Sequence, residues 1–159
     1  MGRCLGDVSE VQPYQDGMPY FEATRKNFQG VRDAMIAELT KPSDLTIDVV
    51  SCESGFFIMI DITKCKDQIP ARFRESHDYE DPSDSAPVLK NKVYMDDGRI
   101  PLDLAFCRWM AVERKVIMMP TSLFYNVSSP FRVDNLVRVC ICKSLEHSIK
   151  AAQRIIGLA

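Results

Sequence analysis

The sequence is most informative at first for what it lacks. It has no apolar run approaching the roughly 20 residues that cross a bilayer, so a transmembrane helix is not expected. It has no cluster of basic residues, and its 20 lysines and arginines are outnumbered by 22 acidic residues. Nucleic-acid binding draws most of its affinity from basic side chains, so a nucleic-acid partner is not expected. Glycine-rich phosphate-binding motifs are also absent.

Histidine is scarce, and the cysteines follow no metal-ligand pattern. His77 and His147 are the only two histidines, and neither stands at zinc-ligand spacing from a cysteine, so no metal site is expected. The six cysteines form no C-x-x-C pair, and the first residues lack a signal-peptide apolar region. We therefore expect reduced cysteines in an intracellular protein, either cytoplasmic or mitochondrial. Cys140 and Cys142 are expected to pack in the core, with redox chemistry as the weaker alternative.

The apolar patterns predict one α+β domain spanning residues 1–159. Helical spacing begins after Pro19, after Pro101 and after Ser144, whereas strand-like runs recur in between. These elements predict a small, mostly antiparallel sheet of about four strands with helices packed on one face. The expected helices cover residues 20–39, 102–115 and 145–156, and the expected strands cover residues 45–49, 56–62, 116–119 and 136–142.

Residues 64–100 break this pattern. The segment is rich in acidic residues, proline and glycine and has few apolar side chains to bury. Composition of this kind favours a long surface excursion over a packed element.

Arg138 stands in the middle of the apolar, β-branched run of residues 136–142. An arginine buried in such a strand would lose several kcal/mol of hydration unless it met an anion, as buried unpaired ions do. A guanidinium can grip a carboxylate through two parallel hydrogen bonds. Two interpretations follow: an internal salt bridge to an Asp or Glu, or a site for the carboxylate of a small substrate.

Four segments together resemble the class I aminotransferases, which are fold-type I pyridoxal-phosphate enzymes. The resemblance lies in residues 55–61 (GFFIMID), 106–110 (FCRWM), 119–125 (MPTSLFY) and 136–143 (LVRVCICK). Within the class they are most similar to the kynurenine aminotransferase, glutamine transaminase K and cysteine-conjugate β-lyase group, which the helix from Tyr20 also fits. The resemblance covers nearly the whole chain except residues 64–100.

The resemblance implies that this chain is the C-terminal small domain of such an enzyme. Arg138 matches the arginine that grips the α-carboxylate of an amino acid or 2-oxo acid substrate. Gly55, Phe57 and Phe124 would form a wall of the same pocket, although a core role for Phe57 stays open. The small domain of many such enzymes also closes over the substrate.

The same resemblance implies that the catalytic machinery lies elsewhere. The lysine that binds pyridoxal 5'-phosphate, the acid beside its ring nitrogen and the phosphate-binding residues belong to the family's large domain. No lysine of this chain has the matching flanking sequence. We therefore expect no catalytic or cofactor-binding residue here, an inactive chain when alone, and a missing large domain or partner chain within a homodimeric complete enzyme.

A second interpretation is a non-catalytic scaffold subunit derived from an aminotransferase and held in a larger assembly. Both interpretations predict exposed apolar surface where another part of the assembly would lie.

Overall fold

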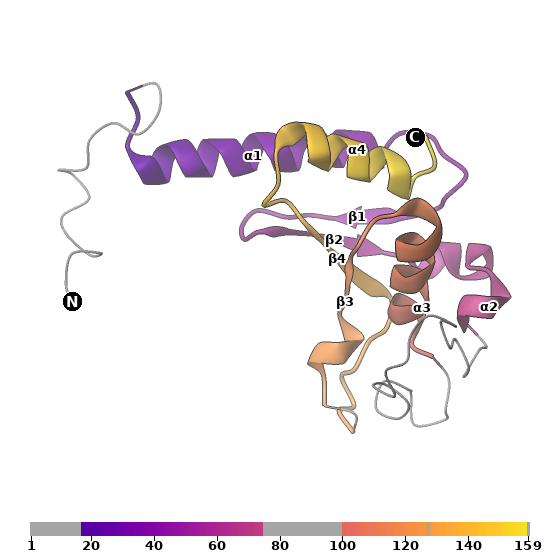
Figure 1. Cartoon of the computed structure of the whole chain (residues 1–159). Coiled ribbons are helices and arrows are strands. Elements are labelled where there is room, and N and C mark those ends of the chain that lie inside the picture. The colour runs from indigo at the N-terminus through magenta and orange to yellow at the C-terminus, as the bar shows by residue number, and fades with distance from the viewer. Residues whose placement is uncertain (1–16, 75–99, 127, 159) are drawn as a thin grey trace, which may run out of the picture.

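The computed structural model describes residues 17–74, 100–126 and 128–158 (Figure 1). Four helices and four strands carry the architecture, and short helical turns join them. None of the described helices is both long and apolar enough to span a membrane. The elements are α1 (Tyr20–Leu39), β1 (Asp48–Val50), β2 (Phe57–Asp61), a 3-10 helix (Thr63–Gln68), α2 (Ala71–Arg74), α3 (Leu102–Trp109), a π-helical turn (Met110–Arg114), β3 (Met119–Pro120), a 3-10 turn (Ser122–Phe124), β4 (Leu136–Cys140) and α4 (Leu145–Ile155).

The strands form one antiparallel sheet in the order β1-β2-β4-β3. β2 and β4 lie in the middle, and their register places Ile58 opposite Val139 and Ile60 opposite Val137. The predicted four-stranded antiparallel sheet is therefore confirmed, and so is the central place of the run that follows Gly55.

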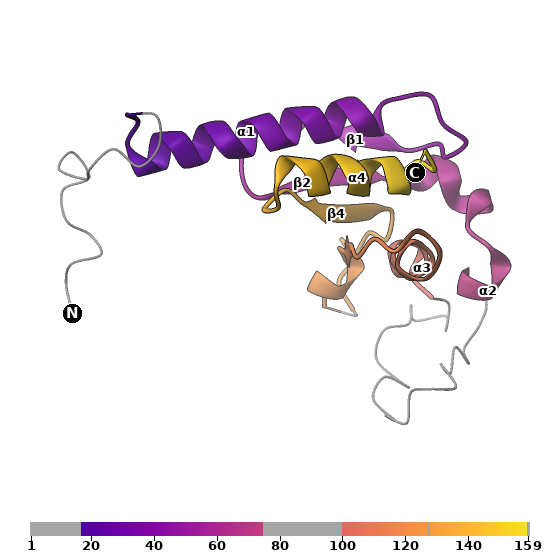
Figure 2. The same cartoon turned by 45° about the horizontal axis from the view of Figure 1, so that its top comes forward.

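The two faces of the sheet have different surroundings. Side chains alternate along a strand, so Ile58, Ile60, Val137 and Val139 share one face, and all four are buried. They belong to one apolar cluster with side chains of α1 and α4, which lie side by side above the sheet (Figure 2). The predicted α+β arrangement with helices on one face is confirmed.

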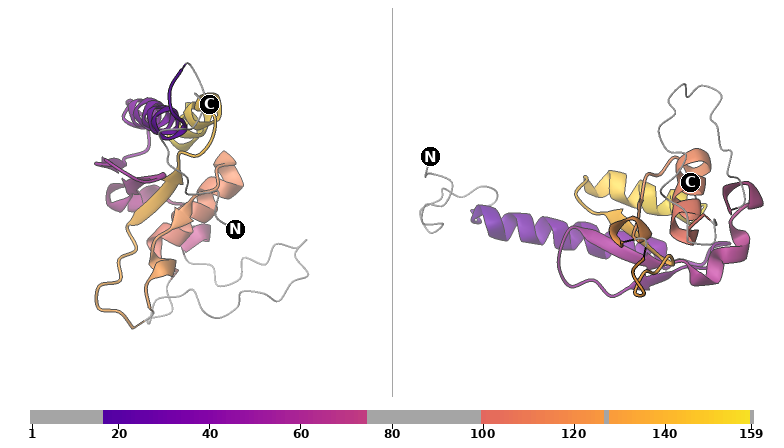
Figure 3. Two further views of the ribbon diagram at one scale, coloured as in Figure 1. Left: turned by 90° about the vertical axis from the view of Figure 1, so that its left-hand side faces the viewer. Right: turned by 90° about the horizontal axis from the view of Figure 1, so that it is seen from below.

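The opposite face is partly open. It carries the alternate positions of β2 and β4, of which Phe57, Met59 and Arg138 are half-buried and Cys140 is exposed. α3 packs near the β3 and β4 side of the sheet, away from the paired helices α1 and α4 (Figure 3). One sheet face thus builds the core, and the other offers side chains to the surroundings.

Local rules set the ends of the last helix. The Ser144 hydroxyl accepts a hydrogen bond from the backbone N–H of His147 at 3.3 Å, which caps α4 as the sequence predicts. Gly157 follows the helix with φ at 79°, a conformation that suits glycine at a helix terminus. The buried face of α4 includes Ser148, whereas Leu145 at the start of the helix is 49% exposed.

Residues 63–74 correct the expected start of the surface excursion. Instead of leaving the domain at residue 64, the chain forms a 3-10 helix and the short α2. Cys65, Ile69 and Phe73 are each no more than 3% exposed, so this segment adds to the core. Three buried side chains spaced four residues apart outweigh the polar composition around them. The remainder, residues 75–99, lies outside the described part of the chain.

All four strands are shorter in the structure than expected, and one cysteine prediction is wrong. β3 contains only Met119 and Pro120, because residues 116–118 do not pair with β4, and the N–H of Val116 donates instead to the carbonyl of Met110 at 3.2 Å. β4 ends at Cys140, two residues earlier than expected. Cys140 and Cys142 are exposed. The predicted core packing is wrong because Cys140 belongs to the open face and Cys142 lies beyond the strand.

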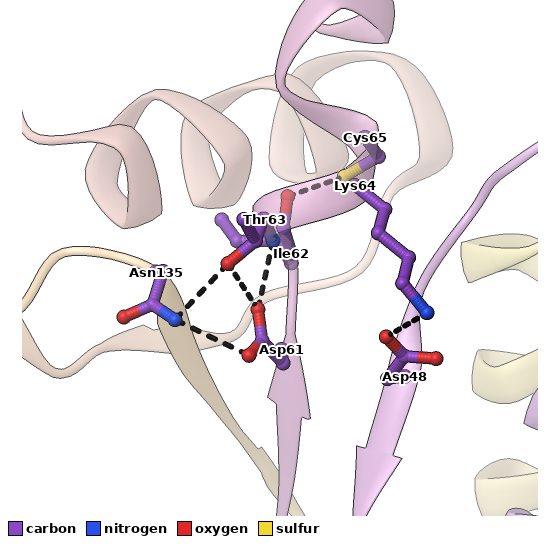
Figure 4. A network of polar contacts seen from close by, with 7 residues as sticks. All are labelled: Asp48, Asp61, Ile62, Thr63, Lys64, Cys65 and Asn135. Carbon is purple, nitrogen blue, oxygen red and sulfur yellow. Dashed lines mark hydrogen bonds and ion pairs between the residues drawn. The ribbon is translucent and has the colours of Figure 1, made fainter.

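A carboxylate at the end of β2 ties this strand to the beginning of β4 (Figure 4). Asp61 accepts hydrogen bonds from the N–H and hydroxyl of Thr63 at 2.8 and 2.6 Å, and from the Asn135 amide at 3.2 Å. The N–H of Ile62 also donates to the carbonyl of Asn135 at 2.9 Å. Partial burial acts to raise the pKa of Asp61, but these hydrogen bonds outweigh it and hold the pKa below its usual value.

Replacing Asp61 by alanine should lower the free energy of unfolding by about 1–2 kcal/mol at neutral pH, because the Thr63 and Asn135 donors lose their acceptor. The lowered pKa means that this contribution is present above the usual Asp value of about 4 and is lost as pH falls through the folded-state pKa. Urea unfolding between pH 2 and 7 should therefore show a smaller acid loss for Asp61→Ala than for the natural chain.

Asp48→Ala is the matched control. Asp48 pairs with Lys64 at 2.7 Å, but both side chains are more than half exposed. An exposed ion pair contributes about 0–1 kcal/mol, so this variant should remain close to the natural chain. Equal losses in the two variants would contradict the role assigned to Asp61.

Candidate functional site

Arg138 occupies the centre of the open sheet face. It is the third residue of β4, with Met59 of β2 opposite on one side and Met119 of β3 on the other. Its side chain is half-buried, so the guanidinium is partly withdrawn from water while remaining reachable. β4 is half-exposed and not mostly buried as expected, because only Val137 and Val139 point into the core.

Two aromatic rings hold the guanidinium. Its central carbon lies 4.2 Å from the centre of the Phe124 ring and 5.5 Å from that of Phe57. Phe57 comes from β2, and Phe124 comes from the 3-10 turn after β3. Stacking on aromatic faces stabilises a guanidinium and leaves its N–H groups free to donate in its own plane.

The internal salt bridge weighed from the sequence is not found among the described residues. Within that part of the chain, no carboxylate pairs with Arg138, and the ion pairs there join other residues. A half-buried guanidinium without an anion keeps a strong tendency to bind one. The arrangement is therefore chemically suited to a carboxylate.

A buried carboxylate positions the turn that carries Phe124. Asp103, in the first turn of α3, is fully buried and accepts hydrogen bonds from the N–H and hydroxyl of Ser122 at 2.6 and 2.7 Å. It also accepts from the N–H of Leu104 at 2.8 Å. Burial raises the pKa of Asp103, and the hydrogen bonds from Ser122 and Leu104 only partly oppose this rise.

The same turn is attached to β4 by a second bond. The Thr121 hydroxyl donates to the carbonyl of Leu136 at 2.8 Å, and Pro120 lies opposite Val137. The turn is thus held both by α3 and by the strand that carries Arg138. No sequence pattern marks Asp103 as a positioning residue, because an acid in the first turn of a helix is common and its partner Ser122 lies 19 residues away.

Gly55 lies outside the cluster of Arg138, Phe57 and Phe124. It has φ at 85°, which explains the need for glycine at the turn before β2. It lines an open groove of about 490 Å³ between α1 and the β1–β2 loop, together with Phe28 and Phe56. The rings of Phe28 and Phe56 meet edge to face at 5.3 Å. Of the four predicted residues, the structure brings three together and leaves Gly55 at this neighbouring groove.

Comparison with curated proteins finds similarity to aminotransferases. The chain is 22% identical over 147 residues to kynurenine–oxoglutarate transaminase 3 of Bos taurus and 23% identical to the same enzyme of Homo sapiens. Each match covers 92% of this chain but 26% of the relative. The chain therefore spans about a quarter of the length of the curated relatives it matches. No protein-family model matches the chain.

Solved aminotransferase structures share the fold. Bna3p, a putative kynurenine aminotransferase from Saccharomyces cerevisiae, matches with a TM-score of 0.58 and 19% identity over 87% of this chain and 27% of its own. YbdL from Escherichia coli, which has a methionine aminotransferase function, matches with a TM-score of 0.54 and 20% identity, over 87% of this chain and 26% of its own. The aspartate aminotransferase from Rhizobium meliloti matches with a TM-score of 0.53 and 19% identity, over 90% of this chain and 28% of its own.

These findings confirm the resemblance predicted from the sequence. The chain has the fold of the small domain of an aminotransferase, and its sequence is similar to kynurenine–oxoglutarate transaminase 3 over almost its whole length.

Replacing Asp103 by asparagine should destabilise the chain by about 1–3 kcal/mol at pH 5, because an amide offers one acceptor oxygen where Ser122 and Leu104 use two. The pH dependence should also change. The raised pKa makes the folded state bind a proton more tightly, so the natural chain loses stability as pH rises from about 4 through the folded-state pKa. Urea unfolding from pH 4 to 8 should show this loss in the natural chain and not in Asp103→Asn.

Asp67→Asn is the control, since Asp67 is exposed in the 3-10 helix after β2. It should retain the stability and the pH profile of the natural chain. A natural-chain pH profile in Asp103→Asn would contradict the positioning role of this buried carboxylate.

Proposed function

We propose that this chain is the substrate-binding small domain of a pyridoxal-phosphate-dependent aminotransferase of the kynurenine and glutamine transaminase type. The observation that carries the proposal is Arg138, half-buried between Phe57 and Phe124 and without an acidic partner in the described residues. Amino acids and 2-oxo acids share one α-carboxylate, and that group fits this guanidinium.

The comparisons support the reaction class without choosing a substrate. The similar proteins include a kynurenine–oxoglutarate transaminase, a methionine aminotransferase and an aspartate aminotransferase. Their amino acids differ in the side chain and have the carboxylate in common. We therefore assign Arg138 to the common group and leave the side-chain preference to residues outside this cluster.

The residues at Arg138 suit a carboxylate but do not fit pyridoxal phosphate. One guanidinium and two phenylalanine rings supply neither the amine for a Schiff base nor a set of phosphate donors. In the proposed enzyme the cofactor, which acts as the electron sink of transamination, is held by a large domain outside this chain.

The chain's own residues then have three tasks. Arg138 binds the carboxylate through two parallel hydrogen bonds and so fixes the orientation of the substrate's α-carbon. Phe57 and Phe124 limit the rotation of the guanidinium and exclude water from its faces. Asp103 holds the Phe124 turn in place. A rigid body carrying these groups could close over the active site as one piece.

A second candidate is a non-catalytic interaction subunit derived from an aminotransferase. The observation that favours it is the number of apolar side chains exposed around the open face, with Met119, Leu123 and Phe124 40%, 48% and 59% exposed. Isolation of the natural assembly distinguishes the two candidates. A partner chain with a pyridoxal-binding lysine would support the aminotransferase proposal. A partner chain without such a lysine would support the interaction-subunit proposal.

The carboxylate assignment can be tested on the chain itself by NMR titration with 2-oxobutanoate. Saturable shifts are expected at the Arg138 Nε–H and the Phe124 ring, whereas the uncharged methyl ester should cause none. Arg138→Lys should weaken binding about tenfold, because an ammonium group cannot make the planar two-bond contact. Arg25→Lys, at an exposed position of α1, should bind like the natural chain. Binding that is indifferent to the Arg138 change would refute the assignment.

The catalytic role requires the assembled enzyme. When this chain is joined to a large domain that restores transamination, Arg138→Ala should lower kcat/KM for the amino acid by about 100-fold, which corresponds to about 3 kcal/mol of lost carboxylate binding. KM should rise and kcat should fall, since misplacing the α-carbon affects both. An unchanged kcat/KM would remove Arg138 from the reaction.

A further inference from the structure

Cys140 and Cys142 form an exposed pair of thiols at the end of β4. Cys140 is the last residue of the strand, and Cys142 lies just beyond it. The backbone N–H of Cys142 donates a hydrogen bond to the Cys140 sulfur at 3.3 Å, so the chain bends toward that sulfur as it leaves the sheet. Two residues of extended chain span about 6–7 Å, which reaches the upper end of the Cα separation in disulfides. The bend shortens that span.

The other described cysteines have different surroundings. Cys65 is fully buried, and burial raises the pKa of its thiol to about 12. Burial also raises the pKa of Cys107. The Cys52 thiol is half-buried and donates to the carbonyl of Phe57 at 3.0 Å. Because the thiolate is the reactive form, Cys140 and Cys142 are the described cysteines best placed for exchange chemistry.

The two thiols also differ from each other. Partial burial, a side-chain hydrogen bond with Cys140 and the charge of Cys140 raise the pKa of Cys142, while the charge of Lys143 opposes this. The N–H of Cys142 meanwhile points at the Cys140 sulfur, where it would stabilise negative charge. The geometry thus favours Cys140 as the attacking sulfur and Cys142 as the one that keeps its proton.

Two basic residues lie close to the pair along the chain. Arg138 lies on the same face of β4, two residues before Cys140, and its guanidinium stacks on Phe57, the residue paired with Cys140. Lys143 follows Cys142 directly. A small disulfide with carboxylate groups would be attracted to this end of the strand, whereas an uncharged disulfide would not.

We propose that Cys140 and Cys142 are a thiol–disulfide exchange site for small anionic disulfides of the glutathione type. The Cys140 thiolate attacks one sulfur of the small disulfide, a new S–S bond forms, and the other half leaves as a thiolate. Cys142 then loses its proton and attacks the Cys140 sulfur, which forms the Cys140–Cys142 disulfide and releases the second half. The two cysteines give up two electrons, and their two protons end on the two released thiols. The inference does not rest on the proposed transaminase role, although both use the positive charge of Arg138.

The test is reaction of the full chain with glutathione disulfide, followed by mass mapping of the cysteine peptides. The natural chain should lose two hydrogens from the peptide with Cys140 and Cys142, whereas Cys65 and Cys107 stay unmodified. Cys142→Ser should accumulate a glutathione adduct on Cys140. Cys140→Ser should react at Cys142 several-fold more slowly than Cys142→Ser reacts at Cys140, because only the Cys140 sulfur accepts the backbone N–H of Cys142, which supports the attacking thiolate. Circular dichroism checks that each variant is folded.

Arg138→Gln separates attraction by charge from simple exposure. It should slow the reaction of Cys140 with glutathione disulfide several-fold and leave the reaction with uncharged hydroxyethyl disulfide unchanged. Equal slowing with both reagents would overturn the anionic preference. Modification of Cys140 no faster than that of Cys52, or no adduct on Cys140 in Cys142→Ser, would overturn the site itself.

Discussion

The pairing of β2 with β4 is the contact on which the rest of the structure depends. Its register sends Ile58, Ile60, Val137 and Val139 into the core and, by the same alternation, directs Arg138 outward. A slip of β4 by one residue would turn that strand over, burying Arg138 and exposing Val137 and Val139. Core burial therefore fixes the orientation of the arginine, and the Asp61 network adds a polar lock at the end of the pair. Core stability and the outward placement of Arg138 share one cause.

Much of this arrangement follows from the sequence, because it depends on local patterns. The limits of α1 and α4, the antiparallel sheet and the place of Arg138 come from helical spacing, capping residues and alternation. The family resemblance predicts Phe57 and Phe124 near Arg138, and the structure brings both rings to the guanidinium. The failures lie elsewhere. The polar composition of residues 63–74 predicts a surface segment, but three apolar side chains bury it against the domain. The apolar neighbours of Cys140 and Cys142 predict core packing, but both cysteines are exposed at the end of β4.

Asp103 illustrates the kind of residue that sequence reasoning misses. Its function depends on a turn that is distant along the chain and adjacent in space. Burying a carboxylate costs free energy, and the three hydrogen bonds it accepts at 2.6–2.8 Å offset that cost. These hydrogen bonds fix the orientation of the Ser122–Phe124 turn, and the position of the Phe124 ring over Arg138 depends on that turn. A single buried acid thus connects the packing of α3 to the outer face of the sheet.

The short edge strands have a consequence for association. β1 contains three residues and β3 two, and the latter includes Pro120, which offers no donor for a further strand. At the opposite edge, β1 carries Asp48 in an ion pair with Lys64, so a strand from another molecule would meet charged side chains there. Such edges resist growth of the sheet from one molecule into the next. The open face exposes apolar side chains, but neither edge of the sheet is suited to polymerisation by adding strands.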